Sequence, residues 1–275
     1  MVIKSTSDIG LHILRGLAGP LGKLGDDYSV PLLAKQADGL PWLLGTGWFF
    51  RCEQEWFLVT AGHVLMELST PKARRAGAPN DLDLLVPGVG DVLVPLSGRM
   101  STSQRYDVGI LWLKDPTPIR ERWTPVTVAD LAPLNDPSKA WYHVTGWPRQ
   151  LSKSLTGGIG AKQFRFTAKF DAGTEPHDPG TEILFPLHRN DFGTFDGEPD
   201  KHPSLQGISG APVWQIFTDD NDNGRYAPRL AGVQISYLER GTIWYIRATR
   251  WGAVRLLIEH VSPGLFSSAE RLVGL

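Results

Sequence analysis

The sequence predicts an all-β protein built from two six-stranded antiparallel β-barrels, with a C-terminal helix and a short helical N-terminal extension. Three observations support this class: the chain has 275 residues, it contains 30 glycines and 21 prolines, and its apolar residues gather in short runs. Turn-forming residues at this density divide a chain into short strands more readily than into long helices. A chain of this length accommodates two domains or one large all-β unit.

The composition indicates a packed globular protein. Hydrophobic residues make up 41% of the chain and charged residues 21%, which excludes a disordered chain. The formal net charge is -1, so we expect no nucleic acid among the partners. His12 and Arg15 interrupt the stretch from Ile9 to Leu21, which is typical of neither a secretory signal nor a membrane span. A single cysteine, Cys52, indicates a reducing compartment, and we expect a cytoplasmic protein without membrane partners.

An N-terminal extension is expected over residues 1–27. N-cap candidates at residues 6–8 precede apolar residues at helical spacing, which predicts one short helix. The pair Gly19-Pro20 is expected to end this helix. The sequence leaves open whether the helix packs on the barrels or docks on another protein.

The first barrel is expected over residues 28–135. Short apolar or alternating runs bounded by Gly, Pro, Asn and Asp predict its strands. These runs are Trp48 to Arg51, Trp56 to Thr60, Leu82 to Val86, Val92 to Leu96 and Val108 to Leu113. The five prolines from Pro116 to Pro137 are typical of a linker, which places the domain boundary near residues 130–138.

The second barrel is expected over residues 136–250, with the same rhythm of short runs. Its expected strands are Trp141 to Thr145, Gln163 to Phe170, Thr181 to Leu187, Ala211 to Phe217, Leu230 to Ser236 and Thr242 to Ala248. Residues 251–275 form the expected C-terminal helix and tail. Apolar residues from Trp251 to Val261 recur at helical spacing, so this helix has one apolar face that packs on a barrel.

Three short segments place a polar residue next to an apolar strand. They contain Thr60-Ala61-Gly62-His63, Tyr106-Asp107-Val108 and Gly207-Ile208-Ser209-Gly210-Ala211-Pro212. Serine acyl transfer needs a hydroxyl, a base that takes its proton and a carboxylate that orients the base. His63, Asp107 and Ser209 supply these groups, and their positions predict a site in a cleft between the two barrels.

The segments resemble the motifs of the trypsin/chymotrypsin-like serine peptidases, in the same order along the chain. In that superfamily the histidine lies in Thr-Ala-x-His, the aspartate precedes an apolar strand, and the serine lies in Gly-x-Ser-Gly-x-Pro. Val144-Thr145-Gly146-Trp147 is also similar to the segment that opens the second barrel of the digestive members. The resemblance covers the chain from roughly Gly45 to the C-terminus.

The resemblance implies a serine endopeptidase that acts on protein or peptide substrates and needs no cofactor. It makes Ser209 the nucleophile, His63 the general acid and base, and Asp107 the carboxylate that orients the histidine. It also assigns the oxyanion hole to the backbone N–H groups of Gly207 and Ser209. A metal site is not expected, because the other histidines lack metal-binding spacing.

The sequence departs from the zymogen-type members of that superfamily beside the serine. Ile208 stands where those members have an aspartate that pairs with a newly cut N-terminus, and an isoleucine cannot form this ion pair. No segment among the first 45 residues resembles their Ile-Val-Gly-Gly start. The resemblance therefore implies a bacterial-type member without cleavage activation, whose oxyanion loop is preformed or is ordered by another element.

Substrate specificity is left open by the sequence. The resemblance assigns the substrate pocket to residues before the serine and to a later strand. The candidate substrate-binding residues are Pro203, Gln206, Ser236 and Tyr237. Because Pro203 occupies the position of the acid that selects Arg or Lys, cleavage after basic residues is disfavoured. The segment from Asp171 to Pro203 is an expected gating loop, which a regulatory protein partner would control.

Two alternatives from other functional classes stay open. A non-catalytic module of the same fold would bind peptides in the cleft, and a serine esterase would use the same triad on a non-peptide ester. The run from Asp219 to Leu230 begins like a calcium loop but lacks a glutamate at its twelfth position. An α/β-hydrolase elbow is disfavoured because that fold has the chain order serine, acid, histidine.

Overall fold

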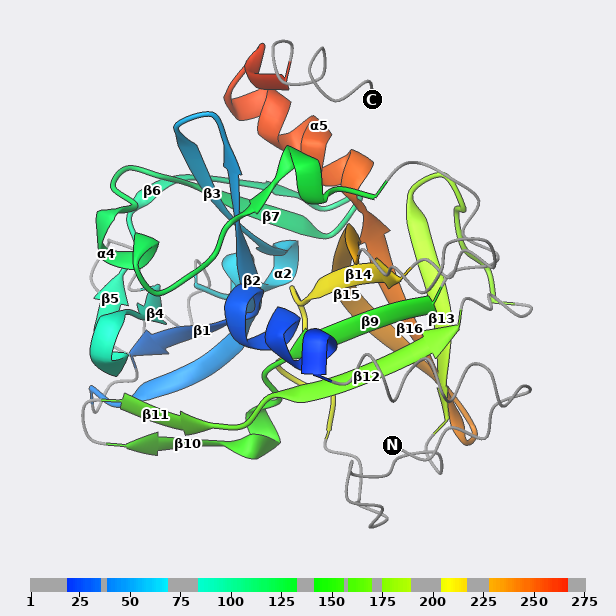
Figure 1. Cartoon of the computed structure of the whole chain (residues 1–275). Coiled ribbons are helices and arrows are strands. Elements are labelled where there is room, and N and C mark those ends of the chain that lie inside the picture. The colour runs from blue at the N-terminus through cyan, green and yellow to red at the C-terminus, as the bar shows by residue number, and fades with distance from the viewer. Residues whose placement is uncertain are drawn as a thin grey trace.

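The computed structural model describes residues 19–35, 39–68, 84–132, 141–155, 158–169, 175–188, 204–216 and 228–266. Figure 1 shows two curled, mostly antiparallel sheets side by side, with few helices. The expectation of a mostly-β protein with two sheets and a C-terminal helix is therefore confirmed. Within these residue ranges, no helix is both long enough and apolar enough to cross a membrane.

In the part of the chain that the structure describes, the first sheet contains eight strands, where the sequence analysis expects a six-stranded barrel. They are β1 (Val30–Lys35), β2 (Pro41–Cys52), β3 (Glu55–Ala61), β4 (Leu85–Pro87), β5 (Leu93–Pro95), β6 (Gly98–Ser103), β7 (Val108–Leu113) and β8 (Val126–Thr127). Their order is β5-β4-β1-β2-β3-β7-β6, and β8 pairs with β2 in parallel. The sequence does not predict β1 or β6, because β1 contains Pro31 and β6 lacks regular apolar alternation.

Among the described residues, the second sheet has six strands. They are β9 (Trp141–Gly146), β12 (Phe164–Lys169), β13 (Glu182–His188), β14 (Pro212–Ile216), β15 (Arg229–Arg240) and β16 (Ile243–Arg250). Their order is β12-β9-β14-β15-β16-β13. A separate hairpin, which the sequence does not predict, consists of β10 (Ser152–Leu155) and β11 (Gly158–Ala161) and lies against β2 (Figure 1).

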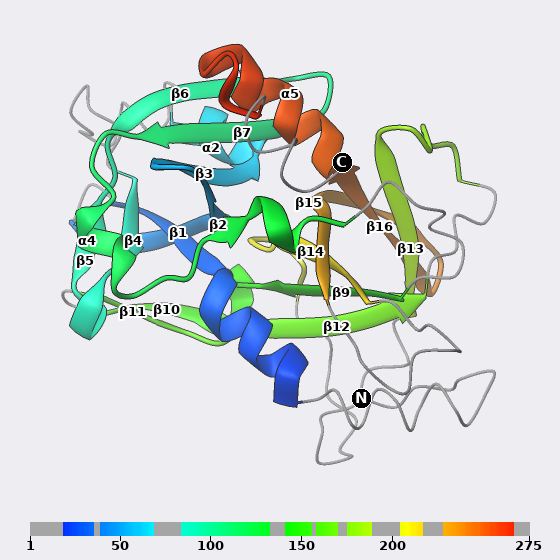
Figure 2. The same cartoon turned by 45° about the horizontal axis from the view of Figure 1, so that its top comes forward.

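The C-terminal helix closes the core of the first sheet. Besides the helical residues 19–28 and 265–266, the described helices are α2 (Gly62–Leu68), α4 (Thr117–Arg120) and α5 (Trp251–Val261), with 3-10 turns η1 (Val89–Asp91), η2 (Val128–Asp130) and η4 (Arg149–Leu151). Figure 2 shows α5 beside β6 and β7, although it follows the last strand of the second sheet. The Trp251 ring lies 4.7 Å from the Phe50 ring and 6.0 Å from the Trp48 ring. The apolar face that the sequence predicts is thus buried against the first sheet.

Residues 19–28 form a helix that the sequence does not predict. The expected helix before residue 19 falls outside the described residues, whereas residues 19–28 are helical. Gly19 and Pro20 are themselves helical, so the expectation that this pair ends a helix is wrong. This helix packs on the protein itself: the Tyr28 ring lies 5.0 Å from the Trp214 ring, and the Gln163 side chain donates to the Gly25 carbonyl at 2.8 Å.

Candidate active site

Strand register brings His63 and Asp107 together. His63 is the second residue of α2, which begins directly after β3, and Asp107 directly precedes β7. β3 and β7 are antiparallel neighbours in which Ala61 pairs with Val108. The end of one strand therefore lies beside the start of the other, and the two polar residues that flank this pair meet.

Asp107 accepts hydrogen bonds from both the ring and the backbone of His63. Asp107 Oδ2 lies 2.7 Å from His63 Nδ1, and the His63 backbone N–H donates to Oδ1 at 2.8 Å. The side chains are 45% exposed for His63 and 28% exposed for Asp107. A carboxylate at Nδ1 favours the imidazole tautomer with the proton on Nδ1, which leaves Nε2 as a base.

The backbone of Asp107 adopts a left-handed conformation, with φ of 47°. An L-residue other than glycine is uncommon there, although aspartate tolerates it better than most residues. The Asp107 carbonyl accepts from the Gly62 N–H at 2.8 Å, which adds to the two bonds from His63. On the other side, Thr249 Oγ1 of β16 donates to the Tyr106 carbonyl at 2.6 Å. Residues of both sheets therefore fix the conformation of the carboxylate.

Ser209 lies on the loop before β14 and contacts β2, the strand that pairs with β3. Thr46 of β2 donates its N–H to the Ser209 carbonyl at 2.9 Å. A Cβ on neighbouring Gly45 would lie 3.0 Å from that carbonyl oxygen and 2.8 Å from Val64 Cγ2. Ser209 and Val64, the residue after His63, therefore both pack against the same segment of β2. The three candidate catalytic residues converge at the junction of the two sheets.

The Ser209 hydroxyl is not hydrogen-bonded to His63. Its Oγ donates to the Ile235 carbonyl at 3.4 Å, which is long for an O–H···O bond. Catalytic hydrogen bonds without substrate are often long or poorly aligned and tighten when substrate binds. Rotation of one side-chain torsion would redirect the hydroxyl without any movement of the backbone.

The backbone amides of Gly207 and Ser209 form the candidate oxyanion hole. Among the described residues they donate to no acceptor, whereas the intervening Ile208 N–H donates to Leu205 and the following Gly210 N–H donates to Gln234. In a trans peptide the C=O and N–H point in opposite directions. The Gln206 and Ile208 carbonyls are both held, by the N–H groups of residues 149 and 211 at 2.8 and 2.9 Å. The N–H groups of Gly207 and Ser209 therefore point away from the residues that hold the two carbonyls.

Two glycines are required by the shape of this loop. Gly207 and Gly210 have φ of 95° and 93°, which L side chains rarely adopt. A Cβ on Gly210 would overlap the Thr46 carbonyl and Thr60 Oγ1. Gly210 therefore allows the nucleophile loop to pack directly on β2 and β3.

Ile208 anchors the loop through apolar packing. It is 1% exposed, and a Cβ on Gly146 of β9 would lie 2.9 Å from Ile208 Cβ. Ile208 is therefore a buried aliphatic side chain that packs on β9. This contact holds the loop on the second sheet without a charged partner.

Thr46 links β2 to the loop that contains Ser209 through hydrogen bonds, and no sequence motif predicts this role. Its hydroxyl donates to the Gly207 carbonyl at 2.9 Å and accepts from the Trp147 N–H at 3.0 Å. Its own carbonyl accepts from Thr60 Oγ1 at 2.6 Å. Thr46 is fully buried. A polar residue between Gly45 and Gly47 inside an apolar strand is the one local signal of this role.

The candidate substrate-binding residues are only partly brought together. Pro203 lies outside the described residues. Gln206 is exposed beside the candidate oxyanion hole, and Ser236 and Tyr237 lie half-buried on β15. β14 pairs with β15 only as far as Val233, so in the described residues the Ser236–Tyr237 backbone pairs with β16 alone. Among the described residues, no strand therefore pairs with the second edge of β15 at Ser236 and Tyr237, next to Ser209.

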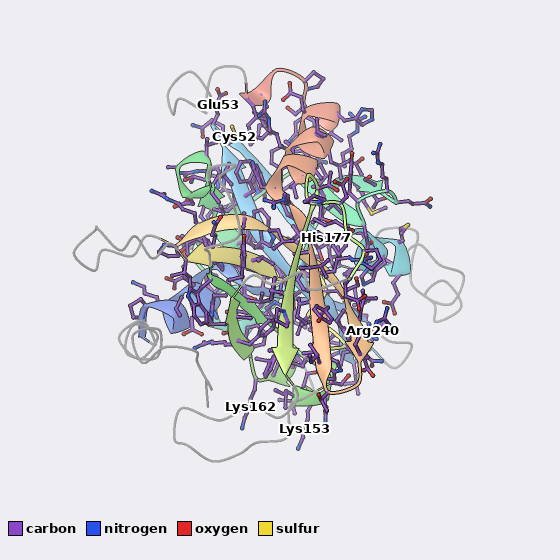
Figure 3. The ribbon with its side chains drawn as sticks, turned by 90° about the vertical axis from the view of Figure 1, so that its right-hand side faces the viewer. Cys52, Glu53, Lys153, Lys162, His177 and Arg240 are labelled. Carbon is purple, nitrogen blue, oxygen red and sulfur yellow. The ribbon has the colours of Figure 1, made fainter. Side chains whose placement is uncertain are left out.

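The expected gating loop is described only over residues 175–188, which include β13. Its first residues are fixed to the second sheet. Arg240 forms a two-point ion pair with Glu175, at 2.8 and 3.2 Å, and Arg247 donates to the Pro176 carbonyl at 3.1 Å. Figure 3 shows His177 and Arg240 on the side of the molecule where the second sheet lies. The rest of the expected loop lies outside the described residues.

Cys52 and His143 have structural roles. Cys52 lies at the β2–β3 turn beside α5 (Figure 3), where its Sγ is 3.7 Å from the Leu265 carbonyl oxygen and burial raises its pKa. The His143 ring lies between the Thr145 and Thr167 hydroxyls, at 3.0 and 2.9 Å. Burial, assisted by Arg165, lowers the pKa of His143 to about 3. A neutral imidazole held in this way is part of the core.

The described residues contain no group of three metal-ligating side chains. The calcium-like run from Asp219 to Leu230 lies almost entirely outside them. Comparison of the whole chain with protein-family models and with curated proteins finds no match to either.

Proposed function

We propose that the protein is a serine endopeptidase of the trypsin-like type, with His63, Asp107 and Ser209 as its triad. The observation that carries the proposal is the Asp107 carboxylate, which contacts both the ring and the backbone of His63 at the junction where Ser209 lies. A carboxylate fixed in this way supports a histidine that acts as a base at Nε2.

The proposed reaction has two steps. Ser209 Oγ attacks the peptide carbonyl while its proton passes to His63 Nε2, and the carbonyl oxygen becomes an oxyanion. The N–H groups of Gly207 and Ser209 stabilise this charge. Collapse of the intermediate breaks the C–N bond, and the amine leaves with the proton from His63. Water then attacks the acyl-enzyme in the same manner, which releases the acid and restores Ser209.

The open edge of β15 favours a peptide over a simple ester. An extended peptide that pairs with the backbone at Ser236 and Tyr237 would gain strand hydrogen bonds next to Ser209. A small ester cannot form this ladder. The substrate class that we propose is therefore an extended protein segment, and the protein would act without a cofactor.

A covalent probe tests the proposal without knowledge of the substrate. The purified protein is treated with a fluorophosphonate and examined by intact mass, together with Ser209→Ala and His63→Ala. We expect one adduct on the wild type and none on either variant, while circular dichroism shows all three folded. A folded wild type that forms no adduct would contradict the proposal and would favour the peptide-binding module.

A second measurement separates the two hydrolase candidates. Untreated wild type, from a preparation shown to react with the probe, is compared on a random peptide library and on p-nitrophenyl esters, and product formation is followed by mass spectrometry and absorbance. If peptides are cleaved only when several residues precede the cleaved bond, the result agrees with strand pairing between substrate and β15. Turnover of esters without any peptide cleavage would make the protein an esterase.

A further inference from the structure

Arg149 connects the first sheet with the loop that contains Ser209. It is the first residue of η4, just after β9. Its Nε donates to the Leu43 carbonyl at 2.8 Å, and its NH2 group donates to the Leu44 carbonyl at 2.9 Å. Its guanidinium lies 4.9 Å from the centre of the Trp42 ring. The side chain is therefore held on β2 by two hydrogen bonds and an aromatic face.

A bulge in β2 provides the carbonyl groups for Arg149. The pairing of β1 with β2 shifts between Leu32 and Leu33, which face Gly45 and Leu43, so Leu44 is the extra residue. A bulge interrupts the strand ladder and leaves backbone groups without a strand partner. The planar fork of an arginine can reach two adjacent carbonyls at once, whereas a lysine ammonium lacks this geometry.

The backbone of Arg149 packs directly on the candidate oxyanion loop. Its N–H donates to the Gln206 carbonyl at 2.8 Å. A Cβ on Gly207 would lie 2.9 Å from Arg149 N and 3.1 Å from Arg149 Cγ. Because the Gln206–Gly207 peptide is planar, this bond also directs the Gly207 N–H away from Arg149. The orientation of one oxyanion donor thus depends on where Arg149 lies.

Arg149 also contacts the helix that contains His63. Its NH2 group lies 3.3 Å from Glu67 Oε2. Glu67 is four residues after His63 in α2, so the two side chains lie on the same helix face. One arginine therefore touches the helix of the base, the bulge of β2 and the loop of the nucleophile.

We propose that Arg149 is a positioning residue that aligns the Gln206–Gly207 peptide with the His63 helix. The inference rests on the proposed function, since alignment matters only if the Gly207 N–H stabilises an oxyanion. Without the guanidinium contacts, the backbone at residue 149 is free to move from β2, and the Gly207 N–H loses its direction. Substrate binding on β15 would not be affected.

The test compares Arg149→Ala and Arg149→Lys with Arg165→Ala. Arg165 is a matched control because its side chain is 32% exposed against 35% for Arg149, and it also joins distant segments through an ion pair, with Asp26. Each variant is assayed for fluorophosphonate labelling rate, for kcat and KM on a p-nitrophenyl ester, and for thermal unfolding.

We expect the labelling rate and kcat of both Arg149 variants to fall about 10-fold to 100-fold, because a small displacement of a catalytic group slows the reaction by that order. The KM of both variants should stay within about 2-fold of the wild-type value. Free guanidinium at low millimolar concentration is expected to restore part of the rate of Arg149→Ala. The Arg165→Ala labelling rate should stay within about 2-fold of wild type even if its unfolding temperature falls. Unchanged labelling and kcat in folded Arg149→Ala would overturn the inference.

Hydrogen exchange separates this inference from the proposed function. Exchange of a peptide that covers residues 204–211 is measured in the Ser209→Ala background, where no turnover occurs. We expect faster exchange with Arg149→Ala and no change with Arg165→Ala. Equal exchange in all three would contradict the role of Arg149. A wild type that does not label overturns the proposed function and, with it, the catalytic meaning of Arg149.

Discussion

Asp107 contacts His63 twice, with Oδ2 on the ring nitrogen Nδ1 at 2.7 Å and Oδ1 on the backbone N–H at 2.8 Å. The two bonds define the plane of the carboxylate and the position of the imidazole relative to its own helix. The tautomer and the orientation of His63 are therefore set by one residue.

Asp107→Asn is expected to slow fluorophosphonate labelling by about 10³-fold to 10⁴-fold. The amide of an asparagine can donate to Nδ1, which moves the imidazole proton to Nε2 and removes the base. Asp115→Asn is the control, because Asp115 is also a hydrogen-bonded carboxylate but lies at the start of α4. Equal labelling of both variants and wild type would show that Asp107 does not orient a catalytic histidine.

Thr249→Val is expected to lower the free energy of unfolding by about 1–2 kcal/mol and to slow labelling. The substitution keeps the shape of the side chain and removes the hydroxyl that donates to the Tyr106 carbonyl at 2.6 Å. Thr249→Ser keeps the hydroxyl and should label at nearly the wild-type rate. If valine and serine variants label equally, the bond to Tyr106 does not support Asp107.

Gly210→Ala is expected to lower the free energy of unfolding by at least about 3 kcal/mol, since a Cβ there overlaps β2 and the residue has positive φ. Gly241→Ala provides the comparison, because Gly241 has φ of 59° but no atom near its Cβ position. Gly241→Ala should lower the free energy of unfolding by about 1 kcal/mol. Urea unfolding of both variants measures the difference. Similar losses would mean that the loop can move away from β2.

Buried His143 is expected to make the fold sensitive to acid. The pKa of its imidazole is lowered from 6.5 to about 3 by burial. Below pH 6.5 the unfolded chain binds a proton that the folded protein does not, so the free energy of unfolding falls by about 1.4 kcal/mol for each pH unit until about pH 3. Above pH 6.5 the effect is absent.

His143→Gln should remove this contribution while keeping polar contacts to the two threonines. Urea unfolding between pH 7 and pH 4.5 is compared for wild type, His143→Gln and His260→Gln, in which the replaced histidine is exposed. We expect the free energy of unfolding to depend less steeply on pH in His143→Gln, and only in that variant. The same slope in all three proteins would mean that His143 does not cause it.

Local patterns predict the regular elements well. The expected strand from Val108 to Leu113 coincides with β7, and the expected helix from Trp251 to Val261 coincides with α5, because a continuous apolar run and a helical apolar stripe are strong signals. β6 and the β10–β11 hairpin are not predicted, since few of their residues are apolar and their pairing depends on neighbouring strands.

The site is predicted only as far as its motifs reach. Short segments predict His63, Asp107 and Ser209 as the candidate triad, and the structure brings His63 and Asp107 into contact and places Ser209 on a loop that packs on β2. Thr46 and Arg149 are not found, because their roles arise from contacts with residues more than a hundred positions away. Such contacts leave no trace in local hydropathy or spacing.

The packing of α5 has a consequence for synthesis on the ribosome. The core of the first sheet includes residues from Trp251 to Phe266, and Cys52 contacts a residue 213 positions later in the chain. The first sheet therefore cannot complete its core until residues up to Phe266 have left the exit tunnel, and such distant contacts also slow folding. His63 and Asp107 are thus synthesised long before the core around them can close.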